Sequence, residues 1–247
     1  MTHCMRWRML RAVLLRFPLP NTMIHINHIA MATQNLYEAV FRLRAETGFG
    51  FYNGGWSHAG TGSMIVPLGD GAYLQVSSLV DPFALDKPDN SGARRTYDQV
   101  ANGDVFESLN LRVDTLDELA QIGAKFGAKP AGNENNGRIQ LNGERIGAVG
   151  LQPAASLPPH VPNVYFFPEM FHHPSGQPVE TAFGLVEPLG ISWVELGGVE
   201  AQVTALLGDS ARSLPLRFTG KPNGVSAVAV KTANKEVVIR RGSIATV

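Results

Sequence analysis

Apolar residues along the chain alternate between strand-like runs and helical spacing in a repeated order. Residues 24–32 form an apolar run that predicts a strand. Asn35 and Glu38 then have the spacing of a capping box at the start of a helix. The helix has apolar residues at helical spacing: Leu36, Val40 and Leu43. Glycine-rich turns separate three further strand-like runs: 50–52, 63–68 and 72–77. The predicted order is therefore β-α-β-β-β.

The same order recurs between residues 106 and 167. Residues 108–113 predict a strand, and Thr115 with Glu118 predicts the capping box of a second helix. Three more strands are expected: 138–141, 145–150 and 163–167. The first two are joined by Asn142-Gly143, which is a strong hairpin signal. A partial third copy begins at Ile191, with a strand, a helix and three strands: 191–196, 199–207, a strand near 216, 225–230 and 236–239.

These repeats predict an α+β fold. One such unit cannot bury its own sheet face, so two units are expected to pair. The paired βαβββ modules, residues 24–79 and 106–168, would form a curved, barrel-like mixed sheet with a cleft, and residues 190–240 would add a C-terminal partial βαββ repeat. Small-molecule sites favour such clefts, so a small-molecule ligand is expected. The modules pair either within one chain or between the two chains of a homodimer, and the sequence leaves both open.

Composition narrows the classes of function. The chain has 247 residues, 44% hydrophobic and 17% charged, which excludes a long disordered protein. Basic and acidic residues number 21 each, so the chain lacks the positive excess expected of a nucleic-acid-binding protein. No apolar run approaches the roughly 20 residues of a transmembrane segment. The single cysteine, Cys4, indicates a reducing compartment, and we expect a cytoplasmic protein.

Residues 1–22 differ in composition from the rest of the chain. They contain four arginines and no acidic residue. This pattern is typical of an organelle transit peptide. The alternative is an upstream start codon, in which case Met23 opens the domain. Either way, we expect residues 1–22 to be an N-terminal extension and residues 23–247 to form the domain.

Residues 26–76 contain an ordered set of motifs. Asn27-His28-Ile29 comes first, and a series of small, polar and aromatic positions follows: Gly54, Gly55, His58, Gly60, Thr61, Gly62, Gly69, Asp70, Gly71, Tyr73 and Leu74. This order resembles the opening module of the glyoxalase-like family in the vicinal oxygen chelate (glyoxalase/bleomycin resistance/dioxygenase) superfamily, in which an acidic residue usually precedes the first histidine. The resemblance implies that residues 23–247 form a glyoxalase-like domain.

The resemblance also implies a divalent metal, Zn, Mn, Mg or Fe, in the cleft. By position, His28 on the first strand and Gln75 on the fourth are the first module's ligands, and Glu169 lies just beyond the last strand of the second module. Gln75 stands where the family usually has Glu, and Asn110 stands where the second module would supply a histidine. The alternative for His28 is a hydrogen-bonded histidine in the core.

His58 is the expected catalytic acid or base. It lies in the glycine-rich segment 54–62, where the backbone can approach a ligand, and imidazole titrates near neutral pH. The alternative is an ordinary histidine of a surface loop. Substrate-binding side chains are expected among polar and aromatic residues of the cleft strands: Trp56, Tyr73, Asn110, Tyr165 and Phe167.

Two functions from different classes remain. The first is an enzyme of lyase, isomerase or dioxygenase type that acts on a small oxygen-bearing metabolite, with assistance from a metal. The second is a noncatalytic protein of the same fold that binds or sequesters a small molecule. The incomplete ligand set favours the binder, whereas His28 and His58 favour the enzyme.

Overall fold

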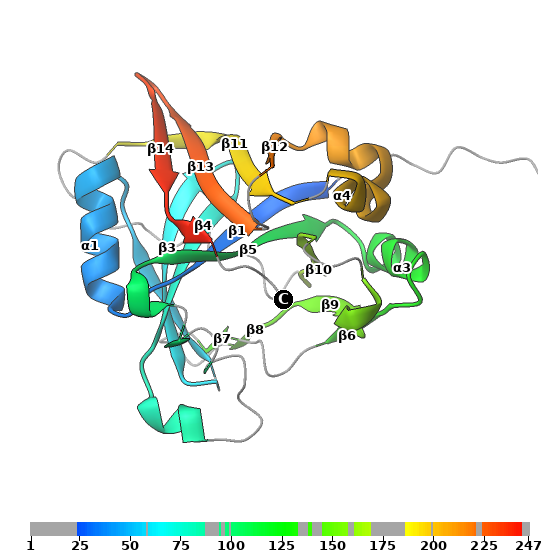
Figure 1. Cartoon of the computed structure of the whole chain (residues 1–247), viewed down its shortest axis with the longest axis horizontal. Coiled ribbons are helices and arrows are strands. Elements are labelled where there is room, and N and C mark those ends of the chain that lie inside the picture. The colour runs from blue at the N-terminus through cyan, green and yellow to red at the C-terminus, as the bar shows by residue number, and fades with distance from the viewer. Residues whose placement is uncertain are drawn as a thin grey trace, which may run out of the picture.

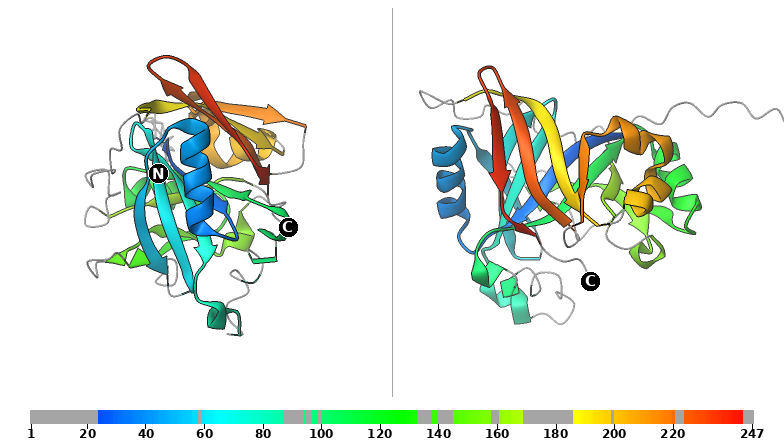
Figure 2. Two further views of the ribbon diagram at one scale, coloured as in Figure 1. Left: turned by 90° about the vertical axis from the view of Figure 1, so that its left-hand side faces the viewer. Right: turned by 45° about the horizontal axis from the view of Figure 1, so that its top comes forward.

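Two β-sheets packed face to face make up the protein (Figure 1; Figure 2). The computed structural model describes residues 24–57, 59–86, 94, 97–98, 100–132, 138–139, 145–157, 161–168, 186–198, 200–220 and 224–243. The larger sheet contains both predicted modules, and the smaller sheet contains the C-terminal segment. The α+β class and the paired βαβββ modules are therefore confirmed.

The first module has the predicted element order. Its elements are β1 (Ile24–Ala32), α1 (Leu36–Thr47), β2 (Tyr52–Ser57), β3 (Thr61–Gly69) and β4 (Ala72–Leu79). The strands lie in the order β1-β4-β3-β2, with β1 parallel to β4. Asn35 caps α1 by accepting a hydrogen bond from the backbone N–H of Glu38 at 3.2 Å. The second strand was predicted at 50–52 but occupies 52–57, because Gly54 lies at an irregularity within the strand and Gly55 pairs with Ser63, so the glycines do not end it.

The second module repeats this arrangement. Its principal elements are β5 (Val105–Val113), α3 (Leu116–Ala124), β6 (Lys129–Gly132), β9 (Val149–Gln152) and β10 (Asn163–Phe166). They follow the order β5-β10-β9-β6, with β5 parallel to β10. The predicted capping box is confirmed, because Thr115 and Glu118 exchange both hydrogen bonds at the start of α3. The modules join through an antiparallel pair, β1 with β5, so they pair within one chain.

The predicted hairpin in the second module has a different position from the one expected. It forms the short strands β7 (Arg138–Ile139) and β8 (Arg145–Ile146), which are antiparallel to each other. Instead of lying beside the other strands of its own module, β7 pairs with β2 at the far edge of the first module. The strand that takes the expected place is β6, whose sequence Lys-Pro-Ala-Gly has no apolar run to reveal it. The described strands of the large sheet therefore follow an open path from β6 to β8.

The C-terminal segment has the predicted element order but its own topology. Its elements are β11 (Pro188–Gly197), α4 (Glu200–Leu207), β12 (Leu216–Thr219), β13 (Gly224–Thr232) and β14 (Glu236–Arg240), and β15 (Gly242–Ser243) returns to pair with β5. Among the described residues, short 3-10 helices also lie outside these elements: η1 (Pro82–Asp86), η2 (Val100–Asn102), η4 (Ala154–Ser156) and η6 (Gly208–Ser213). In the small sheet β11 pairs in parallel with β12, the strand directly after the helix, whereas in both modules the first strand pairs with the last. The segment is thus not a third copy of the module.

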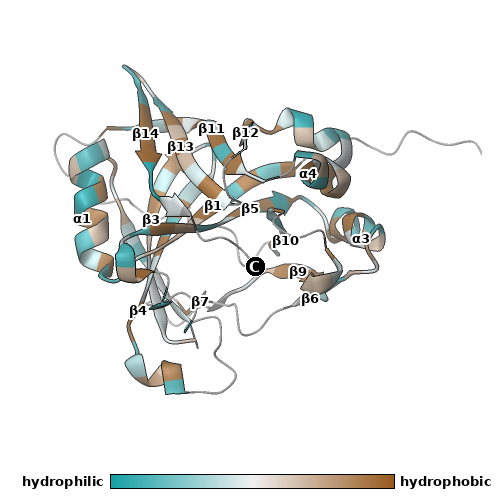
Figure 3. Cartoon of the chain, viewed as in Figure 1, coloured by the Kyte–Doolittle hydropathy of each residue, from teal (hydrophilic) through white to brown (hydrophobic). Residues whose placement is uncertain are grey.

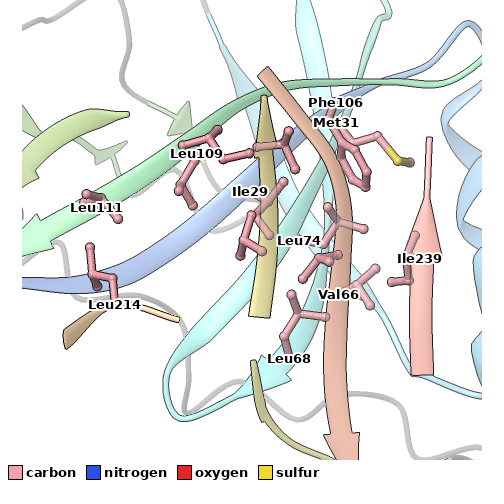
Figure 4. Packing of buried hydrophobic residues seen from close by; sticks show 14 of the residues in the cluster. Ile29, Met31, Val66, Leu68, Leu74, Phe106, Leu109, Leu111, Leu214 and Ile239 are labelled. Carbon is pink, nitrogen blue, oxygen red and sulfur yellow. The ribbon is translucent and has the colours of Figure 1, made fainter. Parts of the chain in front are cut away.

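One hydrophobic core fills the space between the two sheets. Apolar residues alternate with polar ones along the strands of both sheets (Figure 3). Ile29 and Met31 of β1 are fully buried and belong to the same cluster as Val228 and Ile239 of the small sheet (Figure 4). Because side chains alternate along a strand, His28 lies on the opposite face of β1. The small sheet therefore covers one face of the large sheet, and the other face is available for a ligand.

The turn between β3 and β4 packs closely against the small sheet. Gly69 has a positive φ of 88°, and a Cβ at this position would lie 2.2 Å from the backbone nitrogen of Gly190 in β11. Only glycine fits such a contact. Gly69, which belongs to the ordered motif of residues 26–76, therefore allows the two sheets to pack closely. In the described part of the chain, every helix is too short or too polar to cross a membrane.

Candidate functional site

A cleft of about 340 Å³ lies on the face of the large sheet that the small sheet leaves uncovered. It has walls from both modules. Its main polar side chains are His28, Gln75, Asn110, Gln152 and Asn163. Its aromatic side chains are Tyr73, Tyr165 and Phe167. This volume is at the lower end of the range for small-molecule sites.

The strand register relates the two halves of the cleft. His28 of β1 pairs with Asn110 of β5 across the junction between modules. Within its own module, His28 pairs with Tyr73 of β4. Asn110 pairs with Asn163 of β10 in the corresponding parallel ladder. Asn110 is therefore the counterpart of His28, and Asn163 is the counterpart of Tyr73.

Two further side chains complete this correspondence. Gln75 lies two residues after Tyr73 on β4, and Tyr165 lies two residues after Asn163 on β10. Residues two apart on a strand share a face, so Gln75 and Tyr165 extend the same wall in their own modules. Both line the cleft. Besides Tyr73 and Asn163, these strands contribute four related positions that hold an imidazole, two carboxamides and a phenol: His28, Gln75, Asn110 and Tyr165.

His28 is held by two neighbours. Its Nδ1 lies 2.7 Å from Oδ1 of Asn27, a residue that is 3% exposed. The imidazole also stacks on the ring of Tyr73, with 4.9 Å between ring centroids and 17° between planes. A hydrogen bond in the ring plane and a stacked ring on its face together restrict how the imidazole can turn.

The carboxamides of the cleft are anchored by neighbouring side chains. Asn163 Nδ2 donates to Asn110 Oδ1 at 2.9 Å, and Asn110 Nδ2 donates in turn to Ser108 Oγ at 3.0 Å. On the other side, Gln75 Nε2 donates to Ser77 Oγ at 3.3 Å. These bonds fix the orientation of each amide before a ligand arrives, which reduces the entropy lost on binding.

Tyr165 supplies a neutral phenol at the second-module end of the cleft. Desolvation raises the pKa of its hydroxyl above the ordinary value, so the group stays protonated at physiological pH. The ring lies against Gly150 of β9, where an added Cβ would come within 3.0 Å of Tyr165 Cε1. Phe167 follows at a centroid distance of 6.1 Å. Gly150 thus provides the space that this ring occupies beside the cleft.

The structure brings together most of the sequence-predicted site residues that it describes. Six of them line the cleft: His28, Tyr73, Gln75, Asn110, Tyr165 and Phe167. Trp56 does not join them, because it is 41% exposed on β2 while its neighbour Ser57 lines the cleft. His58 and Glu169 lie outside the described residues, so the structure does not test their roles.

Two carboxamide residues of the cleft, Asn163 and Gln152, were not predicted from the sequence. Asn163 lies two residues before Tyr165 on the same strand face, so the strand alternation could have identified it. Gln152 ends β9, a strand whose position in the sheet was not predicted correctly, and no local signal marks it. Both side chains add neutral hydrogen-bonding groups to the wall.

The described donors are a poor fit for a divalent metal ion. In the part of the chain that the structure describes, no group of three or more His, Cys, Asp or Glu side chains is arranged to hold an ion. At the four related positions only His28 is a strong ligand, and Asn110 Oδ1 already accepts a hydrogen bond. A catalytic zinc site normally has three strong protein ligands, such as imidazole, carboxylate or thiolate groups. The described residues of the cleft therefore do not by themselves provide a complete ligand set for a divalent ion.

The fold and the cleft define a class: paired βαβββ modules with a cleft that both modules line. Residues 26–211 match a family model described as a glyoxalase-like domain, and this match covers more than half of the chain. The chain belongs to this glyoxalase-like family, and the resemblance found in its sequence is confirmed.

The solved structures that match this chain have low sequence identity to it. A hypothetical protein from Staphylococcus aureus is 10% identical, with a TM-score of 0.54 over 91% of this chain and 88% of that one. A xylose isomerase-like TIM barrel/4-hydroxyphenylpyruvate dioxygenase fusion protein is 12% identical, with a TM-score of 0.50 over 90% of this chain and 38% of that one. A methylmalonyl-CoA epimerase from Mycobacterium tuberculosis is 15% identical, with a TM-score of 0.39 over 57% and 85%. A comparison with curated proteins finds no match.

Proposed function

We propose that the protein is a glyoxalase-like enzyme of isomerase or lyase type, which moves a proton on a small oxygen-bearing metabolite bound in the cleft. One observation carries this proposal. His28, the one imidazole among the described residues of the cleft, is held by Asn27 and shares the cleft with neutral hydrogen-bond donors. Imidazole is the side chain best suited to proton transfer near neutral pH.

In the proposed reaction, His28 transfers the proton, and Tyr165 and the amide side chains stabilise the charge that forms on the substrate oxygen. The ring nitrogen of His28 that is not bonded to Asn27 takes a proton from the carbon beside a substrate carbonyl group. The electron pair of the broken C–H bond moves onto the carbonyl oxygen, which becomes an enolate. A neutral Tyr165 hydroxyl and the amide groups stabilise that oxygen by hydrogen bonding. Return of the proton from the imidazolium to a neighbouring atom gives an isomer and restores neutral His28, whereas return to the same carbon regenerates the substrate.

The walls of the cleft favour an uncharged ligand. Among its described lining residues there is no Asp, Glu, Lys or Arg. The polar groups are amides, hydroxyls and one imidazole, which bind carbonyl and hydroxyl groups without requiring charge. Aromatic rings on both sides, Tyr73 and Phe167, supply apolar surface for the rest of the molecule. We therefore place the substrate among small, uncharged carbonyl or hydroxy-carbonyl compounds.

The test measures proton exchange directly. In D₂O, the wild-type protein is expected to incorporate deuterium beside the carbonyl of a ligand found by screening uncharged carbonyl compounds with ligand-observed NMR. His28→Gln should reduce the exchange rate at least 100-fold, because glutamine hydrogen-bonds but cannot accept the proton. The matched control is His25→Gln, since His25 lies on the same strand and pairs with Asp114 at 3.6 Å outside the cleft. Equal exchange rates in the wild type and in His28→Gln would contradict the proposal.

A noncatalytic binder is the second candidate. The observation that favours it is the set of amides already hydrogen-bonded within the protein, which builds a preorganised neutral wall. For this function, tight binding with no exchange in the wild type is the expected outcome of the same experiment. The two candidates are therefore separated by one measurement.

Three predictions from the sequence belong to this proposal. A Zn, Mn, Mg or Fe ion would need Glu169 to add a carboxylate to His28 and Gln75, and elemental analysis of the purified protein decides the matter. The cytoplasmic location rests on the single cysteine. A homodimer is also a prediction, although it is not needed to pair the modules, because β1 and β5 of one chain already join them.

A further inference from the structure

Asn27 lies at an irregularity in β1 that changes the direction of its side chain. In the pairing of β1 with β5, Ile26 faces Leu111 and the next pair is His28 with Asn110, so Asn27 is an extra residue between two consecutive pairs. Such a residue is a β-bulge. In a regular strand adjacent side chains point to opposite faces and do not meet. The bulge allows Asn27 to reach the ring of its neighbour His28.

The atoms in this contact determine where the imidazole proton resides. The acceptor is Oδ1 of Asn27, a carbonyl oxygen that has no proton to donate. Nδ1 of His28 must therefore carry the hydrogen, and in the neutral ring the lone pair lies on Nε2. A partner that is 3% exposed and bonded at 2.7 Å holds this arrangement in a place where water competes poorly.

We propose that Asn27 is a positioning residue, which holds His28 in the Nδ1–H tautomer and keeps Nε2 as the proton acceptor of the cleft. The stacked ring of Tyr73 restricts tilting of the imidazole plane, and the hydrogen bond to Asn27 favours the orientation in which Nδ1 faces Oδ1. Because Asn27 is neutral, it orients the ring without adding the negative charge that an aspartate in the same place would bring. The catalytic meaning of this arrangement rests on the proposed function, but the tautomer itself does not.

The experiment reads the tautomer by NMR without any ligand. In protein labelled with ¹⁵N at histidine, long-range ¹H–¹⁵N spectra distinguish a protonated ring nitrogen from one that carries a lone pair. His28→Gln identifies the signals of His28 by their loss. At a pH where His28 is neutral, the wild type is expected to show a protonated Nδ1 and an unprotonated Nε2.

Variants at position 27 test the cause. Asn27→Leu keeps the number and branching of the side-chain heavy atoms but has no acceptor, so the Nε2–H tautomer is expected to become the major form. Asn27→Asp keeps an oxygen acceptor in place, so the hydrogen is expected to stay on Nδ1, and this conservative variant serves as the rescue. If Asn27→Leu fails to fold, Asn27→Ser and the wild-type spectrum still test the proposal, because serine is too short to preserve the bond and is expected to lose the tautomer preference.

Two results would overturn the inference. One is a wild-type His28 with an unprotonated Nδ1, and the other is a folded Asn27→Leu or Asn27→Ser protein that keeps the wild-type tautomer. Neither depends on deuterium exchange in a substrate. A protein that shows the expected tautomer but no exchange would refute the proposed enzyme and leave the positioning role of Asn27 intact.

Discussion

At the scale of single residues, Gly150 leaves room for the ring of Tyr165 beside the cleft. Gly150→Ala would place a methyl group 3.0 Å from Tyr165 Cε1, so the ring must shift from its place in the cleft wall. We expect ligand affinity to fall about tenfold. The free energy of unfolding should fall by only about 1 kcal/mol, because a side chain at the wall of an open cleft can shift to relieve the contact. Calorimetric titration and urea unfolding measure the two effects.

The matched control is Gly147→Ala. Gly147 also lines the cleft, but an added Cβ there meets nothing within 4 Å. Its affinity is expected to stay within about twofold of the wild type. Equal losses in the two variants would show that any methyl group in this wall harms binding and that the Tyr165 ring is not the cause.

Residue-scale features of the site were partly predictable. His28, Gln75 and Asn110 were predicted from their positions in the family-like motif and in the repeated module, and all three line the cleft. The contact between Asn27 and His28 was not predicted, because the side chains of adjacent residues in a regular strand point to opposite faces. No local sequence pattern indicates the β-bulge at Asn27 that brings them together.

At the scale of elements, the β3–β4 turn joins the two sheets. Gly69→Ala combines an unfavourable φ with a Cβ 2.2 Å from Gly190 N, so the turn must separate from β11. Gly71→Ala has a φ of 75° but nothing within 4 Å, so it has the backbone strain alone. We expect Gly69→Ala to be less stable than Gly71→Ala by about 2 kcal/mol in urea unfolding. Equal stability of the two variants would mean that the contact with β11 contributes nothing.

Element prediction succeeded where sequence signals are local and failed where pairing is distant. The caps at Asn35 and Thr115 lie within four residues of their partners, and both helices begin where predicted. The hairpin β7–β8 was recognised from Asn142-Gly143, but its pairing with β2 joins residues some eighty positions apart, for which a turn signal has no information.

At the scale of the whole molecule, the two sheets share one core and should unfold together. Ile239 of β14 is 2% exposed and belongs to the same cluster as Ile29 of β1 (Figure 4). Ile239→Ala is expected to lower the free energy of unfolding by about 3 kcal/mol, with a single transition by both fluorescence and circular dichroism. Its neighbour Val238 is 41% exposed, so Val238→Ala should cost about 0.5 kcal/mol or less. Two separate transitions would show that the small sheet is an independent unit.

The sequence by itself determined the types of element, the helix caps, the duplicated βαβββ order and the polar residues that alternate on the first strands of each module. These features depend on interactions between residues close together in the chain. Only the tertiary structure decided which face of the large sheet the C-terminal segment covers, where the β7–β8 hairpin pairs and how Asn27 meets His28. Those outcomes follow from packing and strand register between distant segments, where competing arrangements differ in burial and not in local pattern.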